Sequence, residues 1–193
     1  MTDKSGKLIV LVAPSGAGKT TIARKLLSEF SKLRFSTSAT TRPPRKGEKD
    51  GVHYFFMSND EFDETIENQG FLEWEVYNGH RYGTLREEVE KVIKNGYFPL
   101  LDIEVKGALN VKKMFGDRCE SIFIQPPSLE ELKLRLKKRG SETTESLETR
   151  LKRAEQELAY ANRFDFIVVN DELEKAYKQV KTIVKSFTGN SKN

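Results

Sequence analysis

Residues 8–21 constrain the fold of this chain more than any other segment, and they read LIVLVAPSGAGKTT. The apolar run 8–12 has the composition of a strand buried in a parallel sheet. A loop of small residues follows, and beyond it Ile22, Leu26 and Phe30 recur with the spacing of one helix face. Strand, glycine-rich loop and helix in this order predict a phosphate-binding P-loop.

The loop itself indicates a nucleoside triphosphate as the ligand. Gly16 and Gly18 let successive backbone N–H groups turn toward one anion, and the helix N-terminus adds its dipole. Lys19 is then expected to reach the β- and γ-phosphates, and the hydroxyl of Thr20 to lie beside Mg²⁺. Ala13 stands where the motif has its first glycine, but a strand end tolerates a Cβ. The expected ATP-binding residues of this segment are Ala13, Pro14, Ser15, Gly16, Ala17, Gly18, Lys19, Thr20 and Thr21.

Composition narrows the alternatives. A length of 193 residues with 37% hydrophobic residues suits one compact domain. No apolar run approaches the ~20 residues of a membrane span, and the single cysteine, Cys119, fits the reducing cytoplasm. The net charge of +4 comes from 33 basic and 29 acidic residues without a basic tail. A local phosphate site therefore explains the excess better than nucleic acid does.

Apolar strand patterns alternate with helical patterns along the chain. Buried strands are expected at 98–103, 121–125 and 166–169, with charged helices at 128–139 and 146–161 between the last two. This alternation predicts an α/β fold with a parallel sheet. The polar segments 34–83 and 126–160 read as insertions beside the sheet, with aromatic strands at 52–56 and 71–77.

Two serine- or threonine-led patterns predict helix starts. Ser58 is followed three residues later by Glu61, and Thr84 by Glu87, which is the spacing of a capping box. Short helices are therefore expected to begin after Ser58 and after Thr84.

Three further sets of polar residues suggest chemistry. Arg42 and Arg45 flank two prolines, whose stiff backbone holds both guanidinium groups on one side, suiting a second anion; a solvated loop explains them as well. Asp102 ends a buried strand at the edge where ligands of α/β sheets bind, which suits Mg²⁺, although a helix cap is the alternative. Three arginines border the apolar stripes of the two charged helices and could close over a triphosphate, although charges on exposed helices are usually just solvated: Arg135, Arg139 and Arg150.

Taken together, these motifs resemble the guanylate kinase family over residues 5–187. The P-loop is followed in family order by SATTRPPRKGE at 38–48, GVHY at 51–54, FLEW at 71–74 and YGT at 82–84. The segments LDIEVKGA at 101–108, PPS at 126–128, RL at 135–136, RG at 139–140 and ND at 170–171 complete the resemblance.

The resemblance implies a P-loop kinase with three parts. These are a parallel core sheet flanked by helices (about 5–33, 84–125 and 161–188), a mixed α/β GMP-binding lobe (about 34–83) and a helical lid (about 126–160). It also implies transfer of the γ-phosphoryl group of ATP to GMP with Mg²⁺, with dGMP as a further acceptor, in a cytoplasmic monomer or small homo-oligomer that binds neither membrane nor nucleic acid.

The site residues follow from the same resemblance. Arg42, Arg45, Tyr54 and Tyr82 are expected to hold the phosphate of GMP. Glu73 is expected to accept from the guanine N1–H and amino group, with Ser38, Thr84 and Glu104 around the base; Glu104 stands where many relatives have Asp. Asn170 is expected near the adenine, Thr20 and Asp102 near the metal, and Asp102 also at the GMP site. Lys19, Arg42, Arg135, Arg139 and Arg150 are the expected catalytic cations.

Two other functions fit parts of this pattern. Guanylate-kinase-like modules of scaffold proteins bind phosphopeptides, but they typically have degenerate P-loops, whereas Gly18, Lys19 and Thr20 match the motif here. A kinase for another phosphorylated acceptor is the second alternative, and Ser38 and Glu73 argue against it because both suit guanine.

Overall fold

The core of the molecule is a five-stranded parallel sheet. The structure, a computed structural model, describes residues 6–77, 79–138 and 144–189. The strand order is β2-β7-β1-β8-β9, and every neighbouring pair runs parallel. The five strands are β1 (Leu8–Val12), β2 (Leu33–Phe35), β7 (Phe98–Asp102), β8 (Cys119–Gln125) and β9 (Phe166–Val169). The central strand β1 is buried along its whole length, as its apolar sequence predicts.

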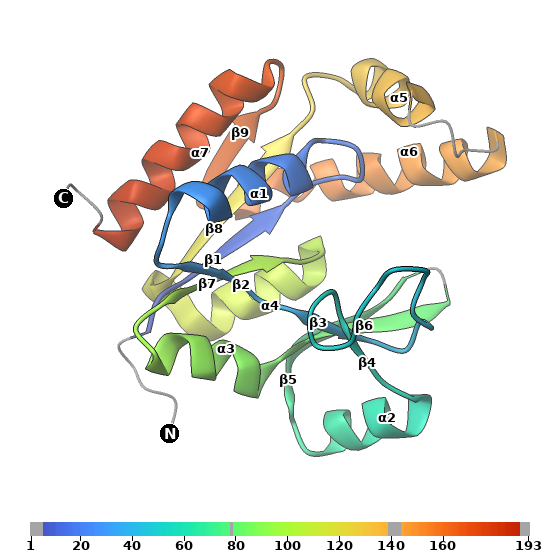
Figure 1. The fold of residues 1–193 in the computed structure, drawn as a ribbon. Helices are drawn as coiled ribbons and strands as arrows, with labels where there is room; N and C mark the ends of the chain where they lie inside the picture. The colour runs from blue at the N-terminus through green and yellow to red at the C-terminus, as the bar shows by residue number, and fades with distance from the viewer. Residues whose placement is uncertain (1–5, 78, 139–143, 190–193) are drawn as a thin grey trace.

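Helices cover both faces of this sheet (Figure 1). Alternate side chains of β1 point to opposite faces. Ile9 and Leu11 therefore pack against α1 (Lys19–Glu29) and α7 (Leu173–Thr188). Val10 packs on the other face with α3 (Arg86–Lys94) and α4 (Val105–Phe115). Single 3₁₀ turns at η1 (Gly116–Arg118) and η2 (Ala161–Arg163) lead into β8 and β9.

A second, four-stranded sheet lies beside the core. It contains β3 (Ser38–Thr40), β4 (Phe55–Phe56), β5 (Phe71–Tyr77) and β6 (His80–Leu85), in the order β4-β3-β6-β5. The pair β3–β4 is parallel and the other two pairs are antiparallel. Helix α2 (Asn59–Glu67) packs on this sheet through Phe62, whose ring centroid lies 4.4 Å from that of Phe71.

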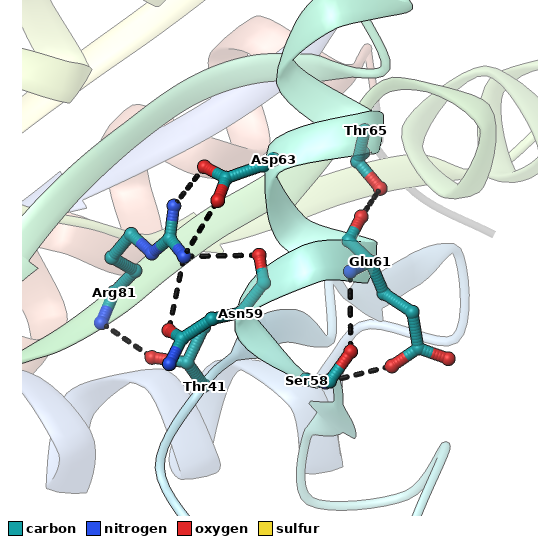
Figure 2. A network of polar contacts seen from close by, with 7 residues as sticks. All are labelled: Thr41, Ser58, Asn59, Glu61, Asp63, Thr65 and Arg81. Atoms are coloured by element: carbon teal, nitrogen blue, oxygen red, sulfur yellow. Dashed lines mark hydrogen bonds and ion pairs between the residues drawn. The ribbon is translucent and has the colours of Figure 1, made fainter.

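Figure 2 shows how α2 begins and how it is fastened to the sheet. The backbone N–H of Glu61 donates to Ser58 Oγ at 3.1 Å, and the Ser58 N–H donates to Glu61 Oε2 at 2.7 Å. The predicted capping box at Ser58 is therefore confirmed. The guanidinium of Arg81, on β6, contacts the Asp63 carboxylate of α2 and donates to Asn59 Oδ1 at 2.9 Å.

Two charged helices pack against each other, namely α5 (Leu129–Lys138) and α6 (Thr144–Leu158). The apolar cluster between them contains Leu132, Leu136, Leu147 and Ala154. The two helices lie near the end of the core sheet at which β1 enters the P-loop (Figure 1). A Cβ built on Gly16 would lie 2.9 Å from Leu136 Cδ2, so α5 packs closely on this loop.

The predicted α/β class with a parallel core sheet is confirmed, but two local predictions are wrong. Thr84 does not cap a helix: α3 has Leu85 as its N-cap, without a side-chain hydrogen bond, and Thr84 lies inside β6. The strand expected at 52–56 is limited to Phe55–Phe56, because Val52 lies in an exposed turn. Among the described residues, no helix is both long and apolar enough to cross a bilayer.

Candidate active site

The P-loop joins β1 to α1 and turns sharply at two glycines. Gly16 has φ +94° and Gly18 has φ +99°, a left-handed conformation that glycine adopts without strain. Gly18 is also the N-cap of α1, where its lack of a side chain leaves the first helical N–H groups unobstructed. Because these donors and the helix dipole favour negative charge, the loop suits a bound phosphate.

The Lys19 ammonium, at the first residue of α1, is held by a carboxylate at the end of β7. Its Nζ lies 2.5 Å from Asp102 Oδ1 and 3.4 Å from the carbonyl oxygen of Ile103. Burial lowers the pKa of this lysine, but attraction to Asp102 and Glu104 outweighs it, so the pKa of Lys19 is raised above its ordinary value. Lys19 is thus a fixed positive charge beside the loop.

A cavity of about 230 Å³ lies over this loop. Its wall contains every predicted ATP-binding residue except Ala17 and Asn170, and it also contains Arg150 of α6. Asn170 lies behind the loop, nearly fully buried, and its Nδ2 donates to the Ala17 carbonyl at 2.7 Å. A Cβ on Gly18 would lie 2.3 Å from that same amide nitrogen, so Asn170 supports the loop from below. Its predicted contact with adenine stays a prediction.

A second cavity, of about 470 Å³, opens between the core sheet and the four-stranded sheet. The predicted GMP-binding residues that line it are Ser38, Arg42, Arg45, Tyr54, Glu73, Tyr82, Asp102 and Glu104. Thr84 is fully covered, and its hydroxyl reaches the cavity only through Glu73, to which it donates at 2.5 Å.

The two arginines of this cavity are organised by one carboxylate, Glu48. Arg42 Nη2 lies 2.9 Å from Glu48 Oε1, and the backbone N–H of Arg45 donates to Glu48 Oε2 at 2.7 Å. The hydrogen bond from Arg42 holds the pKa of Glu48 below its usual range. The Arg42 guanidinium also lies 5.3 Å above the Tyr54 ring, and the Tyr54 and Tyr82 ring centroids are 6.0 Å apart. Cationic and phenolic groups therefore converge here, as an anion site requires.

Glu73 lies on β5 at the buried end of the same cavity. Its residue is only 9% exposed, and a Cβ built on Gly107 of α4 would lie 2.2 Å from its Oε2. Burial raises the pKa of Glu73 to about 7, Glu75 and Glu104 add to the rise, and the Thr84 hydrogen bond opposes it. A carboxylate fixed from both sides can accept two neighbouring donors of a planar ligand.

The three arginines expected in the lid differ in what the structure shows of them. Arg135 donates to the carbonyl oxygens of Asn170 at 2.9 Å and of Asp171 at 3.3 Å, so it ties α5 to the loop after β9. Arg150 lines the P-loop cavity, and Arg139 lies outside the described residues.

Sequence reasoning missed three residues at the junction of the cavities, namely Arg153, Glu75 and Tyr77. Arg153 lines the P-loop cavity, Glu75 the second cavity, and Tyr77 both. Helical spacing from Arg150 could have indicated Arg153, and strand alternation from Glu73 could have indicated the other two.

The two cavities adjoin each other. Thr20, Tyr77, Asp102 and Glu104 belong to the walls of both. One chain therefore holds a cavity over the P-loop next to a second cavity whose wall contains two arginines and the buried carboxylate of Glu73.

Comparison with known proteins gives consistent results. The sequence model of the guanylate kinase family matches residues 5–187. The guanylate kinase of Chlorobium chlorochromatii is 51% identical over 187 residues, covering 97% of this chain and 98% of that protein. The guanylate kinase of Bacteroides thetaiotaomicron is 49% identical, covering 95% and 90%. The crystal structure of guanylate kinase from Anaplasma phagocytophilum has a TM-score of 0.76 at 31% identity, covering 98% of this chain and 90% of that one.

Proposed function

Because this chain belongs to the guanylate kinase family, and is therefore a nucleotide kinase, we propose that it transfers the γ-phosphoryl group of ATP to GMP, giving ADP and GDP. The observation that carries the proposal is the contact between the two cavities. A donor triphosphate on the P-loop and an acceptor monophosphate near Arg42 would meet at their shared wall. Phosphoryl transfer depends on this alignment more than on any covalent partner.

The cations of the site supply the electrostatic part of the reaction. A phosphate oxygen of GMP is already anionic at neutral pH, so it can attack the γ-phosphorus in line without a strong general base. Lys19 and Arg150 face the P-loop cavity and Arg42 faces the acceptor cavity. We infer that they spread positive charge over the transferring oxygens, and that Arg135 and Arg139 assist from the lid.

The residues present also fit Mg²⁺. The hydroxyl of Thr20 and the carboxylate of Asp102 line both cavities, and oxygen donors of this kind, together with phosphate oxygens, are what Mg²⁺ prefers. When bound, the ion would neutralise charge on the β- and γ-phosphates. Thr20 and Asp102 are the residues that would hold it.

We further propose that three parts of the chain have separate roles. Residues 34–83 form the lobe that binds GMP, residues 126–160 form the lid, and the rest is the core. Movement of lobe and lid toward each other would exclude water that could otherwise consume ATP. The proposal extends to dGMP as an acceptor, to the cytoplasm as the compartment, and to a monomer or small homo-oligomer.

A direct product assay tests the reaction. The protein is incubated with MgATP and GMP, dGMP, AMP or UMP, and the nucleotides are separated by anion-exchange chromatography. We expect GDP and ADP in equal amounts from GMP, slower turnover of AMP and UMP, and loss of product with Lys19→Met. Absence of GDP from GMP would refute the proposal, and ATP binding measured by calorimetry would then show whether a nucleotide-binding interaction module remains.

A further inference from the structure

Arg153 on α6 contacts three carboxylates and one aromatic ring. Its Nε lies 2.8 Å from Oε1 of Glu157, one turn further along the same helix. Its Nη2 lies 3.0 Å from Glu104 Oε2 and 3.5 Å from Glu75 Oε1. The guanidinium carbon also lies 4.6 Å from the centroid of the Tyr77 ring.

Three of these four partners belong to parts of the chain outside the lid. Glu75 and Tyr77 are on β5 of the second sheet, and Glu104 is the N-cap of α4 in the core. Arg153 is therefore the place where α6 is fastened to both other parts. The contacts lie at the junction of the two cavities, because Tyr77 and Glu104 line both of them.

The charges around Arg153 make its role specific. Burial raises the pKa of Glu75, and burial together with Glu104 raises the pKa of Glu157, although Arg153 opposes both shifts. Without the guanidinium, the carboxylates of α6, β5 and the α4 N-terminus would repel one another across the junction. With it, the same carboxylates attract α6 toward the lobe.

The contacts of Arg153 do not involve Lys19 or Arg42, the cations proposed to bind phosphate. Arg153 lines the P-loop cavity, but the groups that it contacts are carboxylates and the Tyr77 ring. The Arg153 guanidinium lies over the Tyr77 ring, whereas the carboxylate partner of Lys19 is Asp102. A residue placed in this way can set the position of the lid without touching the transferred group.

We propose that Arg153 is a positioning residue that holds α6 against Glu75, Tyr77 and Glu104 and thereby favours the closed arrangement of lid and lobe. The proposal rests on the proposed kinase function for its kinetic consequence, but the closure itself does not depend on turnover. Closing before the substrates bind reduces the free energy that they must supply, so loss of Arg153 weakens their apparent binding.

Two variants and one control test the kinetic consequence. Arg153→Gln removes the charge, Arg153→Lys keeps it without the planar fork, and Lys152→Gln removes an exposed charge from the neighbouring position of α6. We expect Arg153→Gln to raise the KM for GMP about tenfold with less than about a threefold change in kcat, since the contacts are partly exposed charge pairs. Arg153→Lys should recover part of the loss, and Lys152→Gln should behave as the parent protein. A fall in kcat with an unchanged KM would overturn the positioning role.

A double-mutant cycle tests the partner. If Arg153 acts through Glu75, then Glu75→Gln combined with Arg153→Gln should raise the KM less than the product of the two single effects. Independent, multiplying effects would contradict the assigned contact.

A distance measurement tests closure without catalysis. Spin labels are placed at Glu64→Cys on α2 and Glu148→Cys on α6, two exposed positions, in a Cys119→Ser background. We expect Arg153→Gln to deplete the shorter distances relative to the parent and to Lys152→Gln. Identical distance distributions would overturn the proposal. If the parent makes no GDP, the kinase function fails, whereas this measurement still decides the role of Arg153.

Discussion

The raised pKa of Glu73 predicts that discrimination between GMP and AMP depends on pH. Guanine presents two donors side by side, N1–H and the 2-amino group, and an ionised carboxylate can accept both. A protonated carboxyl cannot. Adenine presents an acceptor at N1 instead, and it therefore prefers the protonated carboxyl, which can donate to it. The two substrates thus select opposite protonation states of one side chain.

The structure sets the size and the pH range of the effect. The shift in the pKa of Glu73 from 4.5 to about 7 corresponds to about 3 kcal/mol against the ionised form, chiefly because the group is buried. GMP must remove a proton from Glu73 below this pKa, so its binding is linked to proton release. We expect the ratio of kcat/KM for GMP to that for AMP to rise about tenfold per pH unit on both sides of pH 7: below it because the ionised form that GMP needs becomes more populated, and above it because the protonated form that AMP prefers is lost.

The assay is a competition between the two acceptors at fixed MgATP across pH 5.5 to 8.5, a range that spans the pKa of Glu73 on both sides. Both substrates carry the same phosphate, so its own titration cancels from the ratio. Glu73→Gln is the control, because the amide keeps the size but does not titrate: its ratio should be small and flat with pH. A parent ratio that does not change with pH would refute the assignment of Glu73 as the guanine acceptor.

Three further predictions concern neighbouring parts of the site. Lys19→Met should fold normally but lose at least ~10²-fold in kcat, because an apolar chain cannot replace a preorganised charge; near-normal turnover would mean that the P-loop assignment is wrong. Gly107→Ala would put a Cβ 2.2 Å from Glu73 Oε2, so it should raise the KM for GMP at least ~10-fold although alanine favours the helix. An unchanged KM would show that Glu73 has room to move. Arg45→Ala should weaken GMP and AMP by similar factors in steady-state assays, since both carry the phosphate, and a change in their ratio would contradict a phosphate role.

Local patterns predicted the parts of this fold that depend on local interactions. The apolar run before the P-loop gave the central strand, and Ser58 with Glu61 gave the start of α2. The same capping pattern failed at Thr84. There the pairing of β5 with β6 sets Thr84 opposite Glu73, eleven residues away, and the threonine hydroxyl bonds the carboxylate instead of a helix terminus. A long-range partner outweighed a local one.

Most residues of the candidate site were predicted only through the resemblance to the guanylate kinase family. Arg42 and Arg45 could be suspected as an anion site from their proline-stiffened spacing alone, but nothing local distinguished Tyr54 from an ordinary strand aromatic. Arg153 was missed because its role depends on contacts with residues far away in the sequence, such as Glu104, 49 residues earlier. From the sequence alone, a charged helix surface is interpreted as solvent-exposed, because the element that packs against it is not known.

One arrangement recurs among the cations proposed to act on phosphate. Lys19 is held by Asp102, and Arg42 by Glu48, each within 3 Å. These carboxylates fix the cations at the cavity walls, so little side-chain entropy remains to be lost when a phosphate arrives. The carboxylates also compete with the incoming phosphate for the cations. An anion of low charge gains little by displacing a carboxylate that already contacts the cation. Only a ligand with several negative charges, such as a triphosphate, offers enough attraction to draw Lys19 away. We infer that this exchange would free the Asp102 carboxylate, one of the two residues proposed to hold Mg²⁺.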